Sequence, residues 1–85
     1  MHIYYMDEKK IILDEKTIKS AVKNRMSGVK CRIEEIEKEM TEMKKAFEVE
    51  HIENVRLRAR KIMEHCMYIC EYVRSIWTVR SFESD

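Results

Sequence analysis

The chain has 85 residues, which is enough for one small domain but too few for a large self-sufficient core. Charged residues make up 39% of it, yet 17 basic residues nearly balance 16 acidic ones, so the overall charge indicates neither a nucleic-acid nor a membrane partner. One glycine, no proline and many Lys, Glu, Met and Ile residues favour an all-α fold, with residues 1–85 as a single small helical domain.

The three cysteines are odd in number and irregularly spaced, which is not the pattern of a disulfide framework. The N-terminus lacks the layout of a secretory signal, and no apolar run approaches the roughly 20 residues that span a bilayer. We therefore predict a cytoplasmic protein with reduced thiols and no membrane partner.

Residues 1–13 differ from the rest because two β-prone runs, 2–6 and 11–13, flank a charged tetrapeptide. The tetrapeptide lacks the Asn-Gly or Asp-Gly pair typical of a tight hairpin, so a β-hairpin and an extended or helical arm both stay open. Because an isolated two-stranded hairpin is marginal in water, this N-terminal arm is expected to lie on an apolar surface.

Two sets of apolar residues recur at alternating steps of four and three, the pattern of helices that pack against other helices. With Asp14 as N-cap, the first set predicts a helix over 14–47 that continues through Gly28, and the second predicts a helix over 55–80 with a tail over 81–85. The first set is Val22, Met26, Val29, Ile33, Ile36, Met40, Met43 and Phe47, and the second is Val55, Ala59, Ile62, Cys66, Ile69, Val73 and Ile76.

The two sets are out of phase, because a continuous helix from Phe47 to Val55 would turn by roughly 800° and leave Val55 about 80° off the first stripe. We therefore predict a turn over 48–54, with Asn54 as the second N-cap, and an antiparallel, coiled-coil-like hairpin. In that hairpin the seven residues of the first set from Met26 to Phe47 each have a counterpart in the second, from Phe47 with Val55 to Met26 with Ile76. The alternative is one long helix that forms a parallel coiled-coil dimer.

The second helix has more apolar surface than the first can cover, because a further stripe lies beside its predicted contact stripe. We predict that this stripe dimerises the hairpin into a four-helix bundle or binds a larger protein, while a solvated stripe is the third reading. Tyrosines of the N-terminal arm are expected to close over Trp77. The predicted interface residues are Met63, Met67, Cys70, Trp77, Tyr4 and Tyr5.

Basic residues gather at the end of the predicted hairpin where the chain begins. Lys and Arg at helical spacing follow a nucleic-acid backbone without reading sequence, but an acidic protein surface or plain solvent suits them equally well. No recognition helix, phosphate loop or stacking platform accompanies them. The patch is Lys16, Lys19, Lys23, Arg25, Lys30, Arg32, Arg74 and Arg80.

Metal binding and catalysis have little support in the sequence. Cys66 and Cys70 share a helix face, but no pair of C-x-x-C motifs is present, Cys31 is expected to point outward, and Cys66 is better read as a buried small apolar residue. No nucleophile with an adjacent base and no sheltered carboxylate pair is evident. We therefore predict no catalytic residues, no metal, no cofactor and no enzymatic activity.

These observations predict a non-enzymatic protein–protein interaction module. It would act as an adaptor, regulator, small subunit or inhibitor of a larger macromolecular machine, through the Met- and Trp-bearing face of the second helix. The alternative is a nucleic-acid-binding accessory protein that uses the basic N-terminal half of the first helix.

Overall fold

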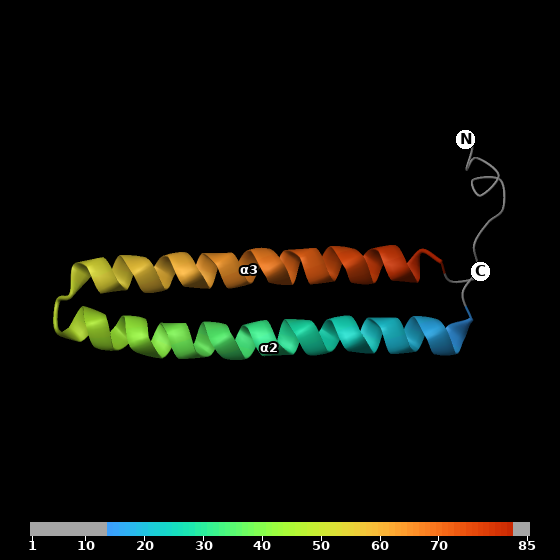
Figure 1. Ribbon diagram of the computed structural model, residues 1–85, viewed down its shortest axis with the longest axis horizontal. Coiled ribbons are helices and arrows are strands. Elements are labelled where there is room, and N and C mark those ends of the chain that lie inside the picture. Colours follow the sequence, from blue (N-terminus) through green and yellow to red (C-terminus); the bar gives the residue numbers. More distant parts are fainter. Residues whose placement is uncertain (1–13, 83–85) are drawn as a thin grey trace, which may run out of the picture.

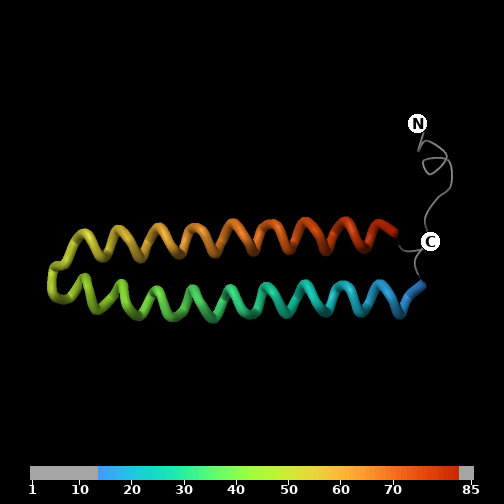
Figure 2. The backbone as a smooth tube through the Cα atoms, in the orientation of Figure 1, coloured from blue at the N-terminus to red at the C-terminus, as the bar shows by residue number. Residues whose placement is uncertain are grey.

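The computed structural model describes residues 14–82, which form two antiparallel helices joined by a tight reversal (Figure 1). α2 comprises Glu15–Glu48 and α3 comprises Ile52–Arg80. The backbone trace shows the two helices side by side along their length (Figure 2). The predicted helical hairpin is confirmed and the single long helix is wrong, because the chain reverses between the helices. The predicted arm over 1–13 lies outside the described residues.

α2 begins where the sequence predicts. The carboxylate of Asp14 accepts a hydrogen bond from the backbone N–H of Thr17, with 2.6 Å between the heavy atoms, which satisfies a donor that has no partner within the helix. Glu15 in the first turn and Lys45 in the last both complement the helix dipole. The helix passes through Gly28 without a break, so this glycine needs another explanation than a helix end.

The reversal takes only three residues. His51 donates its backbone N–H to the carbonyl of Ala46 at 2.8 Å, and Glu50 adopts a positive φ of 56°. Glycine is the usual residue for this left-handed conformation, but here Glu50 adopts it and the turn forms without a glycine. The prediction of Asn54 as N-cap is wrong: because the turn is short, His51 is the N-cap and Asn54 lies in the first turn of α3.

The hairpin buries few side chains. Among residues 14–82 the buried apolar side chains are Ile18, Ala46, Ile76 and Val79. Ile18, Ile76 and Val79 lie near the open end of the hairpin and Ala46 near the turn. Each helix has only one neighbouring helix, so most apolar side chains are at best partly covered. Neither helix in the described part of the chain is long and apolar enough to cross a membrane.

The side of α2 that faces α3 is rotated from the predicted stripe, of which Val22, Val29, Ile36 and Met43 remain half-buried. Four residues of its predicted contact stripe, Met26, Ile33, Met40 and Phe47, are between 41% and 68% exposed. The residue before each of them faces α3 instead, namely Arg25, Arg32, Glu39 and Ala46. Three of these four residues are charged, and the contact accepts them because α3 supplies a polar or charged partner for each (described below).

α3 shows a smaller difference of the same kind. Cys66, predicted as a buried member of the contact stripe, is exposed, and His65 occupies the contact with α2. Because His65 can accept a hydrogen bond from Arg32 and a thiol is a weak acceptor, the rotated α2 favours the histidine at this level. The paired levels also differ from the prediction, which sets Met26 opposite Ile76, because Arg25 contacts Ser75.

Candidate interaction surfaces

Arg32 is the centre of the polar contact between the helices. Its Nη1 donates to Nδ1 of His65 at 3.0 Å, and its guanidinium carbon lies 3.9 Å from the centroid of the Tyr68 ring. A guanidinium over an aromatic face is attracted by the ring quadrupole, and the hydrogen bond requires an unprotonated Nδ1 on His65. Arg32 therefore fixes the level and the tilt of α3 at mid-length.

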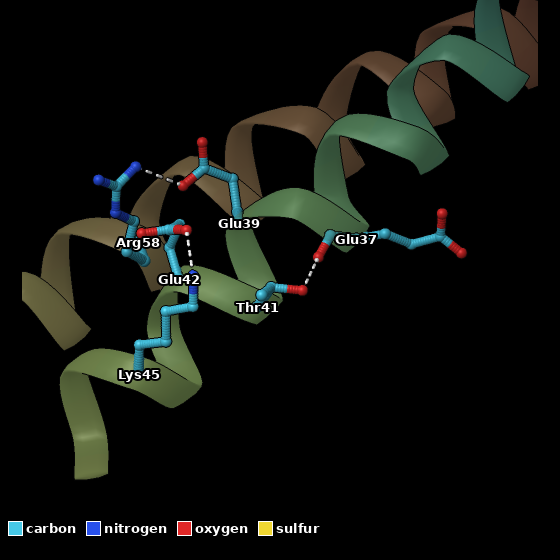
Figure 3. Close-up of polar contacts among 6 residues, drawn as sticks. All are labelled: Glu37, Glu39, Thr41, Glu42, Lys45 and Arg58. Atoms are coloured by element: carbon cyan, nitrogen blue, oxygen red, sulfur yellow. Dashed lines mark hydrogen bonds and ion pairs between the residues drawn. The ribbon is translucent and has the colours of Figure 1, made fainter.

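Glu39 and Arg58 form the best-covered ion pair of the described residues. Figure 3 shows Arg58 reaching from α3 to Glu39 on α2, with Nη1 3.0 Å from Oε1. The two side chains are 26% and 14% exposed, so solvent screens this pair less than the pairs within one helix, such as Glu42 with Lys45. Nε of Arg58 is buried without a hydrogen-bond partner, a desolvation cost that the pair has to offset.

Gly28 lies against Tyr72 on the same polar side. A Cβ at position 28 would lie 2.6 Å from Cζ of Tyr72, so only a residue without a side chain leaves room for the ring. One turn away, Nε of Arg25 donates to Oγ of Ser75. The Tyr72 ring on Gly28 and the polar contacts of Arg25, Arg32 and Glu39 close one side of the hairpin, and we call this side the polar side.

The other side of the hairpin is apolar and uncovered. In an antiparallel pair, residues one step beyond the contact on each helix come to the same side. Shallow grooves there are lined by Met43, Phe47 and Val55 near the turn and by Val73 and Trp77 farther along α3. We call this surface the open face; its exposed members are Met26, Ile33, Met40, Phe47, Met63, Cys66, Cys70 and Trp77.

The predicted interface residues fall into three groups. Met63, Cys70 and Trp77 are exposed on the open face. Met67 is 68% exposed but lines a groove with Glu64 on the outer side of α3. Tyr4 and Tyr5 lie outside the described residues.

The sequence pattern does not predict the contribution of α2 to the open face. The pattern predicts that Met26, Ile33, Met40 and Phe47 contact α3, but all four are exposed. Their spacing of seven residues identified one surface correctly, but spacing alone does not say which neighbour covers a surface.

Charge is unevenly distributed along the hairpin. In the described residues of the open half, 14–32 and 67–82, eight basic residues stand against three acidic ones, a formal charge of +5. In the turn half, 33–66, nine acidic residues stand against seven basic ones, a formal charge of −2. The long axis of the hairpin therefore has a basic end and a weakly acidic end.

The residues of the predicted basic patch do not form one free surface. Arg25 and Arg32 are engaged in the polar side, while Lys19 pairs with Glu15 and Arg74 with Glu71. Lys19, Lys23 and Arg80 line a shallow groove at the open end together with Ile18 and Val22. Exposed Lys16 and Lys30 form no ion pair with residues 14–82.

The cysteines and histidines do not converge. Within residues 14–82, no group of three or more His, Cys, Asp and Glu side chains is placed to hold a metal ion. Cys31, Cys66 and Cys70 are free and exposed, as two open-face thiols on α3 and one separate thiol on α2.

Comparison with known proteins gives no match: no protein-family model, no curated protein and no solved structure is similar to the chain. The fold and surfaces define a two-helix hairpin with a closed polar side and an open apolar side. An assignment of function therefore starts from those surfaces.

Proposed function

We propose that the chain is a non-enzymatic protein–protein interaction module whose binding surface is the open face. The observation behind this proposal is that one side of the hairpin exposes large apolar side chains from both helices along its whole length, with Phe47 and Trp77 both more than two-thirds exposed. Continuous apolar surface of this kind is uncommon on a monomer and typical of a protein-binding site.

The composition of the open face fits binding rather than catalysis. Methionine, with three rotatable bonds and a polarisable sulfur, adapts to the shape of a partner, and tryptophan and phenylalanine are frequent anchors of interfaces. The concavities on this face are shallow and lined mainly by apolar atoms. Such a surface suits an adaptor, a regulator, a small subunit or an inhibitor that acts by occupying another macromolecule.

Site-specific photo-crosslinking in cell extract tests this function whatever the partner is. Benzoylphenylalanine replaces Phe47 on the open face or, as the control, Lys38, which is exposed on α2 away from that face. We expect crosslinks to another polypeptide chain from position 47 and few from position 38. Equal crosslinking from both positions, or none from position 47, would contradict the proposal.

A second candidate function, binding of nucleic-acid phosphates, is favoured by the groove at the open end. Lys19, Lys23 and Arg80 line it together, so three cations face one concavity. The test is fluorescence anisotropy with a generic duplex. Binding should fall steeply between low and moderate salt and should be lost in a Lys19→Glu/Lys23→Glu variant. The control, Lys44→Glu/Lys61→Glu, makes the same charge change in the turn half; equal losses in both variants would rule this function out.

A further inference from the structure

We propose that the open face binds a second copy of this chain in antiparallel orientation, which makes the functional unit a four-helix bundle. The inference rests on the proposed function, because it names the partner of the same face. In this bundle α2 lies over α2 of the second copy and α3 over its α3, and the turn of each hairpin covers the open end of the other. Three observations support the arrangement: the size of the face, the distribution of charge and the relative level of the two helices.

The size of the open face matches what a stable dimer requires. The face extends along the 29 residues of α3, about 44 Å at 1.5 Å per residue, and is two helix diameters or roughly 20 Å wide. Its plan area is therefore about 900 Å² per copy, close to the roughly 800 Å² that each partner contributes to a standard interface. A second hairpin has the same length and width, so it covers the whole face, whereas a single partner helix would cover about half of its width.

The shortage of enclosed core points in the same direction. The described hairpin buries four apolar side chains and leaves Met26, Ile33 and Met40 on the open face between 41% and 54% exposed. A chain of this size usually needs a disulfide, a metal or an oligomer partner to bury enough apolar surface. The described cysteines are free and residues 14–82 hold no cluster of metal-binding side chains, so of these three a second copy is the one that would cover the open face along its length.

Charge selects the antiparallel orientation. The open half of the described hairpin has a formal charge of +5 and the turn half −2. A parallel dimer would place the two basic ends together, whereas an antiparallel dimer places each basic end over the weakly acidic end of its partner. The half-length of the hairpin exceeds the screening length of about 8 Å at physiological salt, so each end interacts mainly with the end that lies over it.

The contacts of Arg32 fix where the two-fold axis passes. Arg32 touches both His65 and Tyr68, so Ile33 on α2 and Cys66 on α3 lie at one level near mid-length. If the two copies overlap fully, the axis passes through this level. Each Ile33 then meets the Ile33 of the other copy, and each Cys66 meets its own counterpart.

This geometry makes the cysteines position markers for the dimer. Cys66 lies at the axis, so the two Cys66 thiols come together. The two Cys70 residues would be eight residues apart along the bundle, about 12 Å, which exceeds the roughly 7 Å Cα separation that a disulfide tolerates. In a parallel dimer Cys66 would face α2 of the second copy and not another cysteine. Cys31 is exposed away from the open face and serves as the control.

The first measurement is the molar mass of the full chain by light scattering with size-exclusion chromatography. We expect a dimer at micromolar concentration, and at least a tenfold weaker self-association in Ile33→Glu. Thr41→Glu adds the same charge at an exposed position of α2 away from the open face and is expected to remain a dimer. A folded monomer at these concentrations would overturn the inference.

The second measurement tests orientation and does not depend on a variant that disturbs the interface. Two single-cysteine chains are oxidised with copper phenanthroline in air: Cys31→Ser/Cys70→Ser, which keeps Cys66, and Cys66→Ser/Cys70→Ser, which keeps Cys31. We expect most of the first chain to run as a disulfide-linked dimer on a denaturing gel, and the second to crosslink at least tenfold more slowly. A dimer by mass in which Cys66 crosslinks no faster than Cys31 would overturn the antiparallel arrangement.

The inference and the proposed function fail separately. A monomer that still crosslinks from position 47 to a different protein retains the function and overturns the second copy as partner. A chain that is monomeric and forms no crosslink from position 47 loses both. A dimer with fast Cys66 crosslinking supports both, since the open face is then a protein-binding surface with an identified occupant.

Discussion

The polar side and the open face of the hairpin differ in the kind of contact that their side chains need. On the polar side charged side chains have directional partners across the helices, such as Arg32 with His65 or Glu39 with Arg58. On the open face Met40, Phe47 and Trp77 are exposed and need no directional partner, so they gain stability only when another surface removes them from water. The polar side therefore determines how the two helices pair, and the open face determines how much more surface the hairpin must still bury.

The polar side provides specificity for one register of the two helices, and the open face provides the surface for association with a partner. Directional pairs reject a slipped register, because a shift of one turn would leave a charged group such as Arg58 partly buried without a partner. Apolar contacts tolerate such shifts but provide most of the free energy of burial. A hairpin built in this way has a defined register before it meets any partner, and a partner then gains from a preorganised surface.

The largest effect is expected where the contact between the helices is fully closed. Ile76→Ala should reduce the free energy of unfolding by about 2 to 3 kcal/mol, since Ile76 is only 6% exposed and its truncation leaves a cavity. Ile52→Ala is the matched control, with the same change at a position that is 63% exposed, and should cost below about 1 kcal/mol. Urea unfolding followed by circular dichroism measures both; equal costs would mean that the contact does not stabilise the hairpin.

The polar side can be tested with two Glu–Arg pairs of equal length. Glu39–Arg58 and Glu53–Arg56 both have 3.0 Å between nitrogen and oxygen, but the second pair is within one helix and far more exposed. Double-mutant cycles to alanine should give a coupling energy of about 1 to 2 kcal/mol for the first pair and below about 0.5 kcal/mol for the second. Similar coupling energies in both pairs would show that solvent screens the inter-helix pair just as well.

Gly28 provides a sharper test of the packing on the polar side. Alanine normally stabilises a helix interior by about 1 kcal/mol over glycine, but here its Cβ would displace the ring of Tyr72. We expect Gly28→Ala to bring no gain in the native chain and a gain of about 1 kcal/mol in a Tyr72→Ala background. Thermal unfolding of the four variants gives the coupling directly. A full gain in the native chain would mean that Tyr72 does not pack on Gly28.

The hairpin itself follows from the sequence because its signals are local. Asp14 precedes a long run of helix formers, and the apolar phase breaks between Phe47 and Val55, so helix start and reversal both come from short stretches. The exact turn does not follow in the same way. Glu50 in a left-handed conformation has no sequence signature, because its strain is tolerated only through the contacts around it.

The rotation of α2 could not be predicted from the apolar pattern. Arg25, Arg32 and Glu39 look like solvated residues until their partners on α3 are known, and those partners depend on the register. One signal was available. A glycine inside a long helix usually has a packing reason, and Gly28 lies on the stripe that faces α3. With Gly28 facing α3, helical spacing puts Met26 and Ile33 at the outer edge of the contact.

The smallest effect is expected at Asp14, outside both sides of the hairpin. The backbone N–H of Thr17, helped by the Thr17 side chain, donates to the Asp14 carboxylate and holds its pKa below the usual value of about 4. A lowered folded-state pKa means that this cap stabilises the helix fully above pH 4 and loses its contribution as the pH falls through the folded-state pKa. The difference in thermal midpoint between the native chain and Asp14→Ala should therefore be constant from pH 7 to about pH 5 and shrink at lower pH. Asp14→Asn keeps an uncharged acceptor at the cap, so the difference in thermal midpoint between the native chain and this variant should be smaller and should vanish below about pH 5 as the Asp14 carboxylate is protonated. A difference between the native chain and Asp14→Ala that does not change with pH would show that the charge of Asp14 has no part in the cap.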